Sequence, residues 1–183
     1  GGDGNIDQIP DCQQANVTSL VCESGEYVRL ESPSGTQLVG VQATENPAPH
    51  AAPSEQEFPL GFFAFEVHGV SGSTTVTMYL PTGEDSQEYY KWGPLPAYPA
   101  DDTWYLFNFD GSHGAEIFTD RIVLHFVDGQ RGDSDLAVDG IVVDPGGPAQ
   151  PLPRDFGDAP DPTFPTLLTN DGARHGMSNL YLG

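Results

Sequence analysis

Leu60-Gly61-Phe62-Phe63-Ala64-Phe65-Glu66-Val67-His68-Gly69-Val70 is the stretch of the chain that decides its fold. From Phe63 to His68, large apolar side chains alternate with small or charged ones, which is the period of two expected of a half-buried β-strand. Ser71-Gly72-Ser73 is a turn signal, and it leads into Thr74 to Leu80, where apolar residues again occupy every other position. Two strands are therefore expected here.

Similar short runs, rich in β-branched and aromatic residues, recur along the 183-residue chain. They cover residues 17–22, 27–31, 36–43, 88–92, 103–109, 115–118, 121–127 and 138–143. Gly, Pro, Asp and Ser separate these runs, and no segment shows a sustained helical period of 3.6. About nine or ten short strands without intervening helices predict an all-β fold, an antiparallel β-sandwich.

Composition divides the chain into three parts. Residues 1–15 form an Asp-rich loop, residues 16–149 form the sandwich, and residues 150–183 form a Pro-rich linker and extended tail. Near the end of the tail, apolar residues are spaced as in a strand: Met177, Leu180 and Leu182. Such a strand could add to the open edge of a neighbouring copy and propagate a head-to-tail filament. The alternative is that the tail is the truncated start of a following domain.

The charge of the chain limits its partners. With 27 acidic and 6 basic residues, the formal net charge is −21. We expect repulsion from nucleic acids and anionic membranes, because phosphate binding needs clustered Lys and Arg. No apolar run approaches the roughly 20 residues that a membrane span requires.

The N-terminal loop carries oxygen ligands at regular spacing. Asp3, Asn5, Asp7 and Asp11 fall at relative positions 1, 3, 5 and 9, and the carbonyl of Ile9 is available at position 7. This spacing suits a hard cation that prefers oxygen, so it predicts a calcium site. A solvated acidic loop is the alternative.

A second acidic cluster lies between the last two predicted strands. Four aspartates occur within twelve residues: Asp128, Asp133, Asp135 and Asp139. Their like charges repel unless solvent or a cation screens them. We therefore expect a second calcium site here, with a solvated turn as the alternative.

Two cysteines, Cys12 and Cys22, lie ten residues apart near the N-terminus. This proximity favours a disulfide and thus an oxidising, extracellular setting, whereas two free thiols are the alternative.

Aromatic residues concentrate in the region of residues 89–105, including Tyr89, Tyr90, Trp92 and Trp104. The favoured interpretation is that these rings fill the core, and the alternative is that they stack on sugar rings of a glycan. The five histidines are scattered, and the sequence contains no nucleophile elbow and no phosphate-binding loop. We therefore expect no enzymatic activity.

The N-terminal loop resembles the calcium repeats of thrombospondin type 3 and of related bacterial surface linkers. The resemblance includes the ending Ile9-Pro10-Asp11 and the following Gln13-Gln14. Gln8 stands where a glycine usually makes the sharp turn in these repeats. The resemblance implies one bound calcium ion.

Residues 16–149 resemble the choice-of-anchor U domain, a module of bacterial surface proteins. The stretches that carry the resemblance are Phe58-Pro59-Leu60-Gly61-Phe62-Phe63-Ala64-Phe65, Thr74 to Pro81, Tyr89-Tyr90-Lys91-Trp92, and Asp128-Gly129 through Gly132-Asp133-Ser134-Asp135 to Gly147. Leu136 stands where that family usually has a glycine or another small residue. The tail, from Asp155-Phe156-Gly157-Asp158 onward, looks like the opening of another bacterial surface-protein domain.

These resemblances imply large exported proteins held at the cell surface. The sequence thus predicts a non-catalytic, calcium-stabilised, extracellular module with a structural or adhesive role. Its expected partners are calcium, neighbouring domains of a larger surface protein and copies of itself. A carbohydrate-binding module that uses the aromatic cluster is the alternative.

Overall fold

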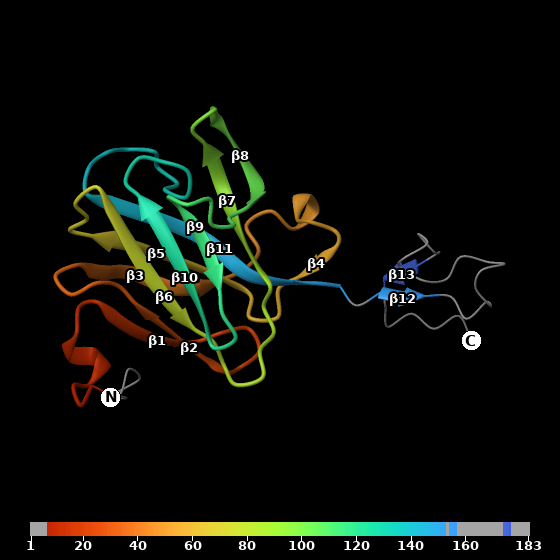
Figure 1. The fold of residues 1–183 in the computed structure, drawn as a ribbon, viewed down its shortest axis with the longest axis horizontal. Coiled ribbons are helices and arrows are strands. Elements are labelled where there is room, and N and C mark those ends of the chain that lie inside the picture. The colour runs from red at the N-terminus through yellow and green to blue at the C-terminus, as the bar shows by residue number, and fades with distance from the viewer. Residues whose placement is uncertain (1–6, 153, 157–173, 177–183) are drawn as a thin grey trace. The chain divides into compact units, whose positions relative to one another are not determined.

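A computed structural model describes residues 7–152, 154–156 and 174–176. Its strands form a five-stranded and a six-stranded antiparallel sheet, which confirms the predicted all-β sandwich (Figure 1). The five-stranded sheet has the order β1 (Val17–Val21), β2 (Tyr27–Glu31), β6 (Ser73–Tyr79), β10 (Arg121–Val127) and β9 (Gly114–Ile117).

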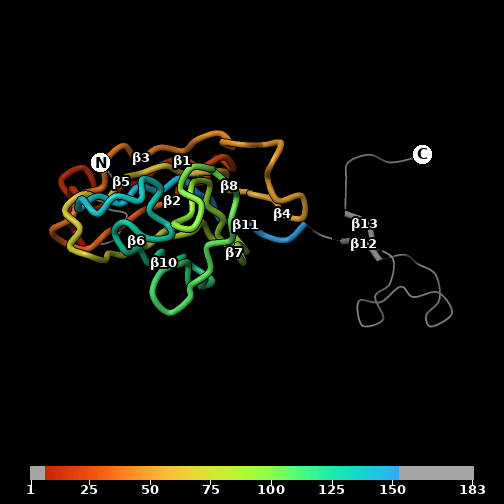
Figure 2. The backbone as a smooth tube through the Cα atoms, turned by 90° about the horizontal axis from the view of Figure 1, so that it is seen from above, coloured from red at the N-terminus to blue at the C-terminus, as the bar shows by residue number. Residues whose placement is uncertain are grey.

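The six-stranded sheet follows the order β3 (Gln37–Thr44), β5 (Phe62–His68), β11 (Ile141–Pro151), β7 (Glu88–Leu95) and β8 (Tyr98–Leu106), and its sixth strand is β4 (Gln56–Glu57). The long connection from β3 to β5 can be followed from orange to yellow in Figure 2. Two short 3-10 turns are present, η1 (Asp11–Gln13) and η2 (Pro49–Ala51), and the described residues contain no α-helix.

The core lies between the two sheets and confirms the predicted alternation. In β5, Phe63, Phe65 and Val67 are buried, and in β10 the same holds for every second residue from Ile122 to Phe126. The rings of Phe65 and Phe126 meet edge to face, with their centroids 6.4 Å apart. The two strongest alternating segments of the sequence thus pack against each other across the sandwich.

The connection 69–72 joins the two sheets rather than forming a hairpin. β5 belongs to the six-stranded sheet, while β6 pairs with β2 and β10 in the other sheet. Gly72 has a φ of 78°, a conformation that a glycine adopts without steric cost. The turn signal Ser71-Gly72-Ser73 therefore marks a crossing between layers.

β11 continues through the Pro- and Gly-rich segment that the sequence placed at the end of the domain. Residues 141–146 pair with β5, and residues 146–149 pair with β7. Pro145 is paired with Ala64 of β5, and Pro148 is paired with Tyr89 of β7. A proline is tolerated in a strand where the ladder does not need its missing N–H.

The predicted disulfide between Cys12 and Cys22 is wrong, since both cysteines are free. Cys12 is exposed in η1, whereas the side chain of Cys22 turns into the core, where Sγ lies 3.2 Å from the Glu26 carbonyl oxygen. The Ser19 hydroxyl donates to Asp11 at 2.7 Å and holds η1 beside the middle of β1. Cys12 therefore lies near Ser19, whereas Cys22 is three residues of extended chain further on, a distance of about 10 Å. A disulfide requires the two Cα atoms to lie within about 7 Å of each other.

Among the described residues, 54–57, 151–152, 154–156 and 174–176 group apart from residues 7–53 and 58–150. In the smaller group, β12 (Arg154–Phe156) pairs antiparallel with β13 (Arg174–Gly176).

Several predicted site residues lie outside the described residues. They are Asp3 and Asn5 of the N-terminal calcium loop, and Met177, Leu180 and Leu182 of the assembly strand.

Candidate functional site

The connection between β10 and β11, residues 128–140, contains all four aspartates of the second acidic cluster. Asp133 is fully buried and accepts two backbone hydrogen bonds, one from the Gly129 N–H at 2.8 Å and one from the Val143 N–H at 3.0 Å. Burial raises the pKa of the Asp133 carboxyl, and the two hydrogen bonds oppose this rise. One carboxylate thereby ties both ends of the connection together.

The other aspartates of this connection also bind its backbone. Asp135 and Asp139 each accept a hydrogen bond from the N–H two residues ahead, at 2.8 and 2.9 Å. Asp128 is buried, and its Oδ2 atom accepts from the Gly140 N–H at 3.0 Å, while its Oδ1 atom has no hydrogen-bond partner in the protein. Asp128 Oδ1 is therefore a buried carboxylate oxygen without a hydrogen-bond partner in the protein.

In the N-terminal loop, the structure brings together two of the predicted calcium ligands. The Gln14 side-chain amide donates to Asp7 Oδ1 at 3.2 Å and to the Ile9 carbonyl oxygen at 3.0 Å. Asp11 instead directs its carboxylate to Ser19 on β1. Among the residues that the structure describes, no group of three or more His, Cys, Asp or Glu side chains is arranged to hold a metal ion. Both calcium sites remain predictions.

Gln8 and Leu136 share an unusual backbone conformation. Their φ angles are 71° and 55°, and within the described ranges they are the two residues other than glycine with a positive φ. These are the positions where the motifs that the two loops resemble have a glycine or another small residue. Each loop thus adopts a left-handed turn that costs a side-chain-bearing residue about 1 kcal/mol or more.

Arg131 fastens the same connection to the loop between β8 and β9. Its guanidinium donates to Asp110 Oδ2 at 3.1 Å and to the carbonyl oxygens of Leu106 and Asn108 at 3.3 and 3.0 Å. Hydrogen bonds to the Asp110 carboxylate, above all the one from the His113 N–H, hold the pKa of Asp110 well below its usual range.

The sandwich interior contains a buried pair of opposite charges. Lys91 on β7 and Asp144 on β11 are both fully buried, and Lys91 Nζ directly contacts Asp144 Oδ1. The Tyr89 hydroxyl donates to Asp144 Oδ2 at 2.8 Å. The rings of Phe107 and Phe126 lie 5.5 and 5.3 Å from Lys91 Nζ, so apolar surface surrounds the amine. Burial lowers the pKa of Lys91 well below its ordinary value.

Sequence reasoning missed this pair, although a signal for it was present. Lys91 is the only lysine of a strongly acidic chain, and it shares one face of β7 with the buried residues Tyr89 and Gly93. A lone lysine at an inward position of an alternating strand needs a buried partner. Asp144 occupies the corresponding inward position of β11.

The structure separates the four aromatic residues of the alternative glycan-binding prediction. Tyr89 is fully buried in the core, so its ring is not available to a glycan. Tyr90 and Trp92 alternate with the inward residues of β7 and lie partly buried on the outer face of the six-stranded sheet, and Trp104 on β8 is also partly buried. The centroids of Trp92 and Trp104 are 5.4 Å apart.

Two phenylalanines complete this outer cluster. The ring of Trp104 lies 5.3 Å from that of Phe62 and 5.9 Å from that of Phe58. The Trp104 indole N–H also donates to the Ala48 carbonyl oxygen at 3.1 Å. The cluster therefore packs under the long connection between β3 and β5, outside the core. Of the four rings that were expected to fill the core, Tyr89 does so, and Tyr90, Trp92 and Trp104 do not.

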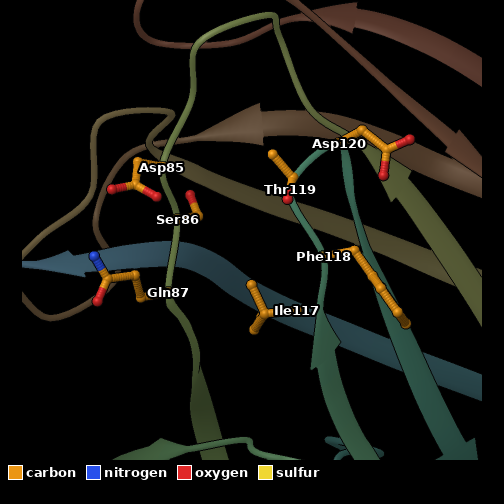
Figure 3. Close-up of a pocket in the computed structure, with 7 residues that line it drawn as sticks. All are labelled: Asp85, Ser86, Gln87, Ile117, Phe118, Thr119 and Asp120. Atoms are coloured by element: carbon orange, nitrogen blue, oxygen red, sulfur yellow. The ribbon is translucent and has the colours of Figure 1, made fainter.

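An open depression of about 630 Å³ lies between residues 85–87, which precede β7, and residues 117–120 at the turn from β9 to β10 (Figure 3). The carboxylates of Asp85 and Asp120 lie on opposite sides of it (Figure 3). Asp120 pairs with Arg121 at 2.9 Å. The two carboxylates of this depression do not converge on one point.

Searches of protein families, of curated proteins and of solved structures find no match for this chain. The helices in the described part of the chain are too short to cross a bilayer.

Proposed function

We propose that this chain is a non-catalytic structural or adhesive module of an extracellular bacterial surface or matrix protein. The observation that supports this most is the use of the acidic loop side chains: Asp133 and Asp135 bind the backbone of their own connection, and Arg131 binds a neighbouring loop. The polar side chains of this connection thus form hydrogen bonds that stabilise the sandwich, which favours a structural role over a catalytic one. The resemblance to bacterial surface modules supports the location.

Surface labelling of the producing cells tests this proposal. An antibody raised against the module should stain intact cells or their extracellular matrix. If the antibody stains the cells only after they are permeabilised, the protein is inside the cell, and the proposed location is refuted.

Calcium is the proposed ligand of the connection between β10 and β11. The net charge of −21 and the coupling of Asp128 to the buried Asp133 make a cation favourable there. Asp128 Oδ1, which is buried and lacks a hydrogen-bond partner in the protein, supplies the ligand atom.

Isothermal titration tests the calcium site directly. Calcium should bind to the whole chain and lose a site in Asp128→Asn, while Asp120→Asn, which changes an exposed aspartate paired with Arg121, should keep it. If both variants bind calcium like the wild type, the site is not at Asp128.

Glycan binding is the second candidate function. Trp92 and Trp104 are only partly buried and lie side by side, so their exposed surface suits stacking on a sugar ring. A glycan array probed with the whole chain decides: hits that disappear in Trp92→Ala would favour this candidate. Filament formation through the tail stays a prediction, because its strand lies outside the described residues.

A further inference from the structure

Lys91 and Asp144 are placed for more than an ion pair. In the β7–β11 ladder, Lys91 lies opposite Gly146, and Asp144 is two residues away on the same inward face. A long side chain can reach such a diagonal neighbour. The amine of Lys91 and the carboxyl of Asp144 therefore meet inside the core, where neither is exposed to solvent.

We propose that Lys91 Nζ and Asp144 Cγ join in an intramolecular isopeptide bond, which cross-links β7 to β11. The pair is separated by 53 positions in the sequence and connects two neighbouring strands of the six-stranded sheet. This inference does not depend on the proposed function, because it follows from the chemistry of the core.

The reaction is a condensation that needs no other reactant. The lone pair of the neutral Lys91 amine attacks Asp144 Cγ of the protonated carboxyl, and a C–N bond forms. The bond from Cγ to Oδ1 then breaks, and Oδ1 leaves as water with the proton of the carboxyl and one proton of the amine. Oδ2 remains as the carbonyl oxygen of the amide, and no atom is oxidised or reduced.

The surroundings favour the neutral amine and the polarised carbonyl that this step needs. Burial lowers the pKa of Lys91, which favours the neutral, nucleophilic amine, although the negative charge of Asp133 acts in the opposite direction. The Tyr89 hydroxyl donates to Asp144 Oδ2 and so polarises the carbonyl that is attacked. Burial raises the pKa of Tyr89, which keeps this hydroxyl protonated as a donor.

The apolar surroundings also favour the product over the ion pair. The rings of Phe107 and Phe126 flank the amine and exclude water, which favours the condensation because this reaction releases water. An ion pair sealed in this place carries the desolvation cost of both charges. The amide removes both charges and keeps an acceptor for the Tyr89 hydroxyl.

Intact mass spectrometry of the denatured whole chain tests the proposal. The wild type should weigh about 18 Da less than its sequence, the mass of one water, while Lys91→Met and Asp144→Ala should have their sequence masses. Cyclisation at Asp-Gly pairs such as Asp110-Gly111 would also remove one water, but it would persist in Lys91→Met. A wild-type mass equal to the sequence mass overturns the proposal.

A tryptic map of the wild type locates the bond even if the variants fail to fold. An acylated Lys91 is not cleaved, so residues 30–121 should stay in one piece and be linked to residues 132–154. Free peptides 92–121 and 132–154 with their sequence masses would overturn the proposal.

Discussion

Gly146 lies directly against the ring of Tyr89: a Cβ atom at position 146 would come 2.6 Å from Tyr89 Cε1 and 2.8 Å from the Tyr90 carbonyl oxygen. Because Gly146 has no side chain, the Tyr89 ring has room to lie over β11. The Tyr89 hydroxyl then reaches Asp144, which is on β11 like Gly146. The packing of a glycine thus determines the hydrogen bond of a buried carboxyl.

Gly146→Ala should destabilise the sandwich by about 1–3 kcal/mol, because one of the two clashing atoms belongs to the backbone and cannot rotate away. Urea unfolding with the whole chain measures this free energy. An unchanged midpoint would mean that the Tyr89 ring has room to move.

Asp133→Ala should reduce the free energy of unfolding by about 3 kcal/mol, because it leaves the partly buried N–H groups of Gly129 and Val143 without their acceptor. Asp135→Ala is the matched control, since Asp135 is exposed and accepts one local hydrogen bond, and it should cost about 1 kcal/mol. Equal losses in the two variants would contradict the assigned role of Asp133.

Asp110 should contribute to the acid sensitivity of the fold. Its pKa in the folded state lies below the ordinary value of 3.8, chiefly because of the hydrogen bond from the His113 N–H. The stabilisation is therefore complete above about pH 4 and is lost as the pH falls below that value towards the folded-state pKa. In melting curves between about pH 5 and pH 2, the wild type should lose more stability than Asp110→Asn. Parallel curves would rule out this contribution.

The two thiols should react at very different rates. Cys12 is exposed and Cys22 is buried in the core, so an alkylating reagent should add one label to the folded protein and two to the unfolded protein. Cys12→Ser should abolish the rapid label. Two rapid labels in the folded protein would show that Cys22 is accessible.

The alternation of apolar residues predicted the fold well, and the reason is local. Phe63, Phe65 and Val67 repeat with the period of a strand, and all three are buried as expected. Sheet membership is not local in this way. β5 and β6 follow each other in sequence and lie in different sheets, because their partners, β11 and β10, come much later in the chain.

Proline misled the prediction at the end of the sandwich. The last strand was expected to end at residue 143 and the linker to begin at residue 150, yet β11 runs through the Pro- and Gly-rich segment to Pro151. The partner of a strand on each side is a tertiary property, so the sequence of the segment does not reveal it.

In the candidate sites too, the sequence predicted local features and did not predict tertiary contacts. Spacing indicated which aspartates share a loop, and the structure places Asp128 and Asp133 in one connection with electrostatic coupling. The spacing in the sequence did not indicate that Asp133 turns inward to backbone N–H groups. Nor did it indicate that Cys12 is exposed while Cys22 is buried. Those outcomes depend on the direction of each side chain relative to the core.

The melting temperature of the whole chain in calcium and in chelator tests the central claim, that a cation bound at the acidic connection stabilises this module. A ligand that binds only the folded state adds about 2.7 kcal/mol when its free concentration is about 100-fold above its Kd. We predict a higher melting temperature in calcium, and a smaller difference in Asp128→Asn than in Asp120→Asn. A melting temperature that is the same in calcium and in chelator would contradict the account.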